Sequence, residues 1–218
     1  MLGRDRALDI LRNAISHSWA DQTEVTIGIG ESSLTRFANS VIHQNVSERN
    51  AGIGIKALIG KSIGYATTNR MDEESIRRTV ARACEFARTS QENPDFVTLP
   101  GPRPVVRLDT CDEQTARFSP EERASAVGGV IAEGRKAGAS AAGTFSTGYE
   151  ESAVINSLGV EAYNSTSLAN LTTVMSLDGG FGYADRVSQR VGDFDPIDAA
   201  VEAATGAVRA RNPEPIEP

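Results

Sequence analysis

The side chains that most often do chemistry in enzymes are few and isolated in this chain of 218 residues. It contains two histidines, His17 and His43, and two cysteines, Cys84 and Cys111. Neither pair has the spacing of a zinc site, and no serine lies in a nucleophile elbow with a histidine base. We therefore predict no catalytic residue and no metal ligand among these residues.

A glycine-rich stretch, residues 54–62, is similar to a phosphate-binding loop. Gly54 and Gly60-Lys61-Ser62 match that motif, but one residue too many separates the two glycines. The stretch also lies between two predicted strands, whereas a phosphate-binding loop must lead into the N-terminus of a helix. A tight hairpin turn at Gly60-Lys61 is the favoured interpretation.

Polar residues beside predicted turns are the remaining candidates for binding. They are Arg36, Asn39, Gln44, Asn156 and Ser157. Their side chains could line a groove and hydrogen-bond an extended peptide that adds to a sheet. They could equally satisfy the backbone groups of their own turns. The turn interpretation is favoured, and the peptide groove stays open as the alternative.

Charge and composition limit the kinds of partner. The net charge of −7 argues against direct nucleic-acid binding, which needs a basic surface. No apolar run is long enough to span a bilayer, and the first residues lack the apolar core of a signal peptide. Two cysteines fit a reducing compartment as free thiols. We expect a cytoplasmic protein with no nucleic-acid or membrane partner.

The elements that must position these residues alternate between helices and strands. A helix is predicted over residues 4–18, and the alternation of Val25, Ile27 and Ile29 predicts a strand. A turn at Gly30-Glu31-Ser32 ends that strand. Further strands are predicted over residues 34–37, 41–47, 52–59 and 63–67. A helix capped by Asp72 follows and ends near Ser90.

The second half of the chain shows the same kinds of signal. Residues 93–104 are rich in proline and predict neither a helix nor a central strand. Ser119-Pro120-Glu121-Glu122 is a capping box that predicts a helix ending near Gly138. Strands are predicted over residues 139–145, 151–156, 160–164, 167–177 and 181–187. The last helix starts after Asp195, with an apolar stripe of Ile197, Val201, Ala204 and Val208.

The order helix, strands, helix occurs twice, and short matches between the halves indicate a duplication. The matched segments are Asn39-Ser40 with Asn156-Ser157, Ile63-Gly64-Tyr65-Ala66 with Phe181-Gly182-Tyr183-Ala184, and the stripe Ile76, Val80, Ala83 and Ala87 with Ile197, Val201, Ala204 and Val208. Their separations differ by only a few residues, and all three lie in the same order in both halves.

The connections between strands are too short for parallel crossovers, so the strands are predicted to be antiparallel. The predicted fold class is α+β, with two pseudo-repeated helix–antiparallel strands–helix units and a largely antiparallel sheet covered by helices. The predicted organisation is a first unit over 1–92, a Pro-rich linker and loop over 93–118, a second unit over 119–211, and a Pro-rich tail over 212–218 toward a missing C-terminal domain.

Several segments in this order resemble the N-terminal domain of the TldD/PmbA family. They are Thr35-Arg36-Phe37-Ala38-Asn39-Ser40-Val41-Ile42-His43-Gln44, Gly52-Ile53-Gly54-Ile55, Gly64-Tyr65-Ala66-Thr67, Asn156-Ser157-Leu158-Gly159-Val160, and the closing helix with its Pro-rich tail. The resemblance covers nearly the whole chain. Each segment is short, and the match rests on their order and spacing.

The resemblance implies a cytoplasmic zinc metallopeptidase system that acts on peptides, works as a homodimer or heterodimer, and has also been named a modulator of DNA gyrase. In the catalytic members, the zinc ligands come from an HExxxH motif in a C-terminal domain. No residue here matches that motif, so no catalytic residue is carried over, and zinc is expected only in the missing domain.

Two hypotheses for function follow from the resemblance. The leading one is a substrate-admitting and dimer-forming N-terminal domain of such a peptidase. The alternative is a stand-alone, non-catalytic peptide-binding or regulatory module that pairs with a full-length relative.

Overall fold

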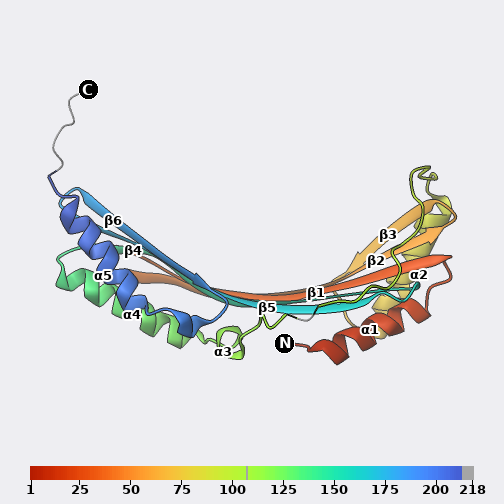
Figure 1. Ribbon diagram of the computed structural model, residues 1–218, viewed down its shortest axis with the longest axis horizontal. Coiled ribbons are helices and arrows are strands. Elements are labelled where there is room, and N and C mark those ends of the chain that lie inside the picture. Colours follow the sequence, from red (N-terminus) through yellow and green to blue (C-terminus); the bar gives the residue numbers. More distant parts are fainter. Residues whose placement is uncertain (107, 213–218) are drawn as a thin grey trace, which may run out of the picture. The chain divides into compact units, whose positions relative to one another are not determined.

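The computed structural model describes residues 1–106 and 108–212, so the predicted tail lies, after Asn212, outside the described residues. The described residues form five α-helices and six strands (Figure 1). In chain order the elements are α1 Arg4–Ser16, β1 Gln22–Ala38, β2 Val41–Ile59, β3 Ser62–Thr68, α2 Glu73–Thr89, α3 Glu113–Ala116, α4 Pro120–Lys136, β4 Ser140–Asn156, β5 Glu161–Leu177, β6 Gly180–Ser188, a 3-10 turn Val191–Asp193, and α5 Pro196–Arg209.

The strands form one six-stranded sheet in the order β3-β2-β1-β4-β5-β6. β2 pairs antiparallel with β3 from Ile53 to Ile59, and β5 pairs antiparallel with β6 from Ala169 to Leu177. The predicted α+β class with a largely antiparallel sheet covered by helices is confirmed. If β1, β2 and β3 are exchanged with β4, β5 and β6, the same strand order results, as expected for a duplicated unit. Among the described residues, no helix is both long and apolar enough to cross a membrane.

Four strands are longer than predicted. The turn expected at Gly30-Glu31-Ser32 does not exist, because β1 continues through it with the same alternation of buried and exposed residues. The breaks predicted within 41–59, 139–156 and 160–177 are also wrong, since a single strand (β2, β4 or β5) runs through each of them. Each interruption in the apolar pattern lies where the strand passes from one compact unit to the other, and no turn forms there.

The chain forms two compact units that exchange hairpins. Unit 1 comprises Met1–Gly30, Arg49–Leu108 and Glu150–Ser165, and unit 2 comprises Glu31–Glu48, Asp109–Tyr149 and Thr166–Pro218. The tip of the β1–β2 hairpin thus belongs to unit 2, and the tip of the β4–β5 hairpin belongs to unit 1. The predicted division at residues 92 and 119 separates the chain by the order of its helices and strands. The compact units are divided differently, because each contains the tip of a hairpin from the other half of the sequence.

Two serine contacts show this exchange at the level of hydrogen bonds. In unit 2, the Ser40 amide donates to the Ala141 carbonyl, and the Ala141 amide donates to Ser40 Oγ at 3.0 Å. In unit 1, the Ser157 amide donates to the Thr23 carbonyl, and the Thr23 amide donates to Ser157 Oγ at 3.0 Å. In each unit, the turn of the incoming hairpin is therefore bound to the first residues of the strand already there.

Each unit has its own apolar core beneath its pair of long helices. In unit 1, Leu8 and Leu11 of α1 and Val80 of α2 pack against β1 and β2. In unit 2, Val127 and Val130 of α4 and the alanines of α5 pack against β4, β5 and β6. Among the described residues, the long helices of each unit lie on one face of its strands, and the opposite face carries no helix (Figure 1).

A glycine in each edge strand lets the closing helix approach closely. A Cβ on Gly64 of β3 would lie 2.1 Å from the Ala83 carbonyl oxygen of α2. A Cβ on Gly182 of β6 would lie 1.9 Å from the Ala203 carbonyl oxygen of α5. Both separations are too short for any side chain, so this helix–strand contact requires glycine at each position.

The predicted stripe of α5 is partly wrong. The buried residues of this helix are Ala199, Ala200, Ala203, Ala204 and Ala207. Val201 and Val208 are instead 48% and 38% exposed. The close approach to Gly182 leaves room only for alanine between helix and sheet, so the larger valines lie on the outer side of the helix.

The predicted helix starts are confirmed. Asp72 caps α2, Asp195 caps α5, and Ser119 with Glu122 forms a complete capping box at α4. Residues 93–104 contain neither helix nor strand, as predicted. The short helix α3, capped by Asp112, was not predicted, because its four residues are too few to show a period.

Candidate functional site

The helix-free face of unit 1 is partly covered by the chain's own extended segment, residues 93–106 and 108. The segment starts beside β3, where the Asn93 amide donates to the Lys61 carbonyl. Further along, the Leu99 amide donates to Gln22 Oε1 at 2.9 Å, and Leu99 is almost fully buried. Unit 1 therefore already binds an extended, Pro-rich polypeptide across the ends of its strands.

Asn156 is the central polar residue of this contact. Its Nδ2 donates to the Pro100 carbonyl at 2.8 Å, and its Oδ1 accepts the amides of Leu158 and Val160. The side chain is 3% exposed. Asn156 therefore satisfies its own turn and binds the chain's own extended segment at the same time.

A groove of about 410 Å³ continues this contact along the same face. One wall is Val105, Val106 and Leu108, which are more than half exposed. The other wall is formed by β1, β4 and β5. Its lining residues from these strands are Thr26, Ile27, Ser152, Ala153, Val154, Ala162, Tyr163 and Asn164. The lining is mostly apolar with neutral polar groups, which suits a peptide better than a charged small molecule.

The other predicted groove residues lie in unit 2. Arg36 alternates with the buried Thr35 and Phe37 and so lies on the helix-free face of β1. Asn39 adopts a φ of 51° in the β1–β2 turn, which asparagine tolerates better than most residues. Gln44 lies on β2. Within the described residues, none of these three side chains forms a hydrogen bond or ion pair. The five predicted residues thus divide between the two units.

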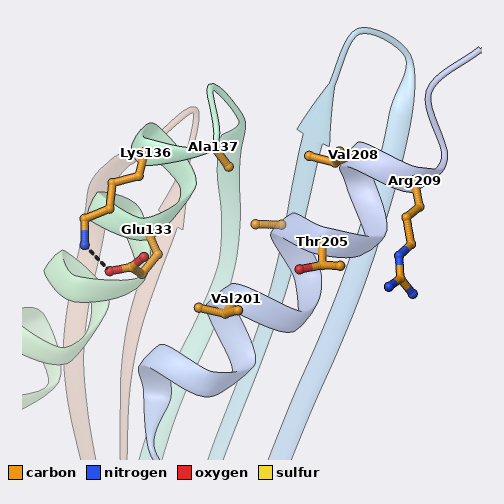
Figure 2. Close-up of a pocket in the computed structure, with 8 residues that line it drawn as sticks. Glu133, Lys136, Ala137, Val201, Thr205, Val208 and Arg209 are labelled. Carbon is orange, nitrogen blue, oxygen red and sulfur yellow. Dashed lines mark hydrogen bonds and ion pairs between the residues drawn. The ribbon is translucent and has the colours of Figure 1, made fainter.

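A second groove lies between α4 and α5 of unit 2 and has a volume of about 390 Å³ (Figure 2). Val201 and Val208 point into it from α5, and Lys136 donates to Glu133 on its α4 side. The corresponding groove between α1 and α2 of unit 1 is lined mainly by charged and polar residues, including Arg6, Asp9 and Asp72. Sequence reasoning missed the α4–α5 groove because it placed both valines in the core.

Among the described residues, each unit also buries one charged side chain, and neither was predicted. In unit 1, Glu151 is 1% exposed and accepts hydrogen bonds from the Leu2 and Gly3 amides and from Tyr163 Oη. Burial alone would raise the pKa of Glu151, but these hydrogen bonds and the N-terminal amino group bring it below its ordinary value. The alternation of β4 was the available signal, because Glu151 shares the face of Ala153 and Ile155.

In unit 2, Arg123 of α4 is fully buried. Its Nη1 donates to the Phe118 carbonyl at 2.7 Å and to Thr147 Oγ1 at 3.0 Å. Nε and Nη2 have no hydrogen-bond partner among the described residues. Burial lowers the pKa of Arg123, against the opposing charges of Glu31, Glu121 and Glu122. The buried cation of unit 2 is therefore less completely paired than the buried anion of unit 1.

The described residues do not fit a metal site, since no group of three His, Cys, Asp or Glu side chains comes together in them. Cys84 is buried in the core of unit 1, and Cys111 is partly exposed in unit 2. This geometry offers binding surfaces for a polypeptide and no set of zinc ligands.

Comparison with known proteins agrees with the sequence motifs. Residues 23–87 match the model of PmbA/TldA metallopeptidase domain 1. The predicted resemblance to the N-terminal domain of the TldD/PmbA family is confirmed. No curated protein matches the chain.

Solved structures share the fold of this chain over most of its length. TldE from Thermococcus kodakarensis superimposes with a TM-score of 0.77 at 16% identity and covers 92% of this chain. Proteins described as candidate modulators of DNA gyrase give TM-scores of 0.75 (Thermotoga maritima, 13% identity, 90% covered) and 0.74 (Bacteroides thetaiotaomicron, 13% identity, 100% covered). The chain spans about half of each, at 47%, 46% and 52% of their lengths.

Proposed function

We propose that this chain acts as the N-terminal, substrate-admitting and dimer-forming domain of a TldD/PmbA-type zinc metallopeptidase in the cytoplasm. The observation that supports this proposal is the match of residues 23–87 to the first domain of these metallopeptidases. The shared fold with TldE and two other proteins of about twice the matched length agrees with it.

In this proposal the zinc ligands come from a C-terminal domain outside these 218 residues. The described residues hold no set of ligands for zinc, so no catalytic step is assigned to them. Bound zinc would supply a Lewis acid and an activated water for peptide hydrolysis. The present residues would admit and orient the peptide, in the way that Asn156 and Gln22 already bind an extended segment.

Dimer formation is proposed from the edges of the sheet. β3 and β6 each have only one neighbouring strand in the described sheet, and an unprotected edge favours pairing with another chain. Phe181, Tyr183 and Val187 of β6 are each more than half exposed, which makes this edge the more apolar of the two. A homodimer and a heterodimer with a TldD/PmbA-type subunit are both compatible with it.

The test measures zinc content, association and peptide cleavage. We expect the 218-residue protein alone to bind no stoichiometric zinc and to cleave no peptide. We expect it to form a dimer by light scattering at micromolar concentration, or to associate with a zinc-containing TldD/PmbA subunit and change that subunit's turnover of peptides. Stoichiometric zinc with turnover by this chain alone, or a persistent monomer that associates with neither, would overturn the proposal. Association without any change in turnover would favour the non-catalytic module instead.

A further inference from the structure

The outer edge of β2 in unit 2 is free where its counterpart in unit 1 is covered. β3 pairs with β2 only from Ile53 onward, so Val41–Glu48 have β1 as their only neighbouring strand in the described sheet. β5 has the same relation to β6, whose pairing begins at Ala169. Beside the early part of β5 in unit 1, however, Val105, Val106 and Leu108 line a groove together with Ala162 and Asn164.

The internal repeat identifies which residues correspond. β1 and β4 have equal lengths, so Arg36 corresponds to Val154. Counting back from the turns into β3 and β6, Gln44 corresponds to Ala162 and Val46 to Asn164. Their counterparts Val154, Ala162 and Asn164 all line the groove formed with Val105, Val106 and Leu108 of unit 1. Arg36, Gln44 and Val46 therefore occupy the equivalent surface of unit 2.

This surface of unit 2 is available for binding. Arg36, Asn39 and Gln44 form no side-chain hydrogen bond or ion pair with the described residues, whereas Asn156 of unit 1 is fully engaged. Val41 and Val46 are 58% and 39% exposed. A strand edge with free backbone groups, exposed valines and unpaired polar side chains is suited to an added extended chain.

The occupant of unit 1 shows what chemistry fits. It is an extended polypeptide whose apolar residues, Val105, Val106 and Leu108, form one wall of the groove. The main difference in unit 2 is that an arginine replaces Val154. A guanidinium on a peptide-binding surface pairs best with a carboxylate, which it binds through two parallel hydrogen bonds.

We propose that the free edge of β2 in unit 2, residues Val41–Glu48 together with Arg36 and Asn39, binds an extended apolar peptide in trans, with a carboxylate of that peptide paired to Arg36. This inference rests on the proposed function only for the biological source of the peptide. The binding surface itself is deduced from the comparison of the two units.

The test uses an acetylated peptide with the sequence of residues 97–106, labelled for fluorescence anisotropy. In unit 1, Val106 lines the groove with Val154, so a peptide that ends at Val106 would place its free C-terminal carboxylate beside Arg36 in unit 2. The same peptide with a C-terminal amide is the control ligand, because it lacks the C-terminal carboxylate. We expect Arg36→Ala to weaken binding of the free acid by about 10-fold and to leave binding of the amide unchanged.

Arg82→Ala is the matched control, because Arg82 is an exposed arginine of α2 without an ion pair in the described structure. We expect it to leave both affinities unchanged. A photo-cross-linker in the peptide is expected to label residues 41–48. Thermal melting by circular dichroism checks that Arg36→Ala leaves the fold intact, as its exposure indicates.

Four results would overturn the proposal. They are no binding of either peptide, equal binding of the acid by Arg36→Ala and the unaltered protein, cross-links to Thr26 or Val154 that show replacement of the chain's own segment, and binding that appears only after residues 213–218 are removed. The assay involves neither zinc nor turnover, so failure of the peptidase proposal would leave its outcome unaffected.

Discussion

The two units of this protein share one plan but differ in what covers their helix-free faces. In unit 1, an extended segment, residues 93–106, crosses the strand ends and is bound by Gln22 and Asn156. In unit 2, the corresponding surface presents Arg36 and Gln44 without partners among the described residues. Both units thus keep the same helix–strand packing, whereas within the described residues only unit 1 holds an extended segment through Gln22 and Asn156.

The buried charges of the two units also differ in how completely they are hydrogen-bonded. Glu151 of unit 1 is bonded by three donors, while Arg123 of unit 2 leaves two nitrogen atoms unpaired in the described structure. A fully bonded charge stabilises one arrangement of the chain, whereas a half-paired one contributes little net stability. The following predictions test how far the two units are equivalent, from the largest expected effect to the smallest.

Gly182→Ala and Gly64→Ala should each destabilise the protein strongly. A Cβ at either position would meet a helix carbonyl oxygen at about 2 Å, so the helix must move away from the sheet. We expect a loss of about 3 kcal/mol in the free energy of unfolding for each variant. Gly28→Ala is the control, because its Cβ would meet nothing within 4 Å. A large loss of unfolding free energy at only one of the two glycines would show that the two helix–strand contacts are not equivalent.

Glu151→Ala and Arg123→Met should separate the two buried charges. Removing the Glu151 carboxylate leaves the Leu2 and Gly3 amides and Tyr163 without their acceptor, at an expected cost of about 2 kcal/mol. Arg123→Met replaces a half-paired cation with an apolar chain of similar length, and we expect a change within about 1 kcal/mol. Urea unfolding measures both values. The reverse order would show that Arg123 is the better-paired charge.

Asn156→Ala should release the covering segment of unit 1. It removes bonds to Pro100, Leu158 and Val160, so we expect a loss of about 1.5 kcal/mol. Hydrogen exchange of residues 98–106 is expected to accelerate at the same time. Asn39→Gly is the control in unit 2, since glycine keeps the left-handed turn and no side-chain bond is lost. Unchanged hydrogen exchange of residues 98–106 in Asn156→Ala would show that Asn156 does not hold the segment in place.

Acid should weaken unit 1 through Glu151. Its pKa in the folded protein lies below the ordinary value of 4.5, so its stabilising contribution is complete above that value and is lost as the pH falls through the lowered pKa. We expect the unaltered protein to lose more stability than Glu151→Gln over this acid range. Urea titrations at successive pH values measure the difference. Parallel stability curves for the two proteins would contradict the expectation.

Val201→Thr and Val208→Thr should have the smallest effects. Both valines are exposed beside the α4–α5 groove, so we expect each change to stay within about 0.5 kcal/mol. Val80→Thr, at the fully buried position of α2 in unit 1, is the contrasting variant and should cost more. Equal losses of unfolding free energy for Val201→Thr and Val80→Thr would show that Val201 is buried, as the sequence predicted.

The local features of this fold follow from sequence alone. The caps at Asp72, Ser119 and Asp195, the hairpin turn at Gly60-Lys61 and the repeated Gly-Tyr-Ala segments each depend on residues a few positions apart. Such short-range chemistry is the same wherever the segment lies in the molecule. The family resemblance also follows from it, because the order of these segments survives in the sequence.

The exchange of hairpins between the units follows only from contacts between distant residues. Whether Gly30-Glu31-Ser32 turns or continues depends on which core receives the next residues, and the burial of Glu151 and Arg123 depends on partners far away in the chain. For the same reason, Asn156 was predictable as a polar residue at a turn, but its bond to Pro100 was not. Sequence periodicity records which residues are apolar, whereas packing determines which of them meet.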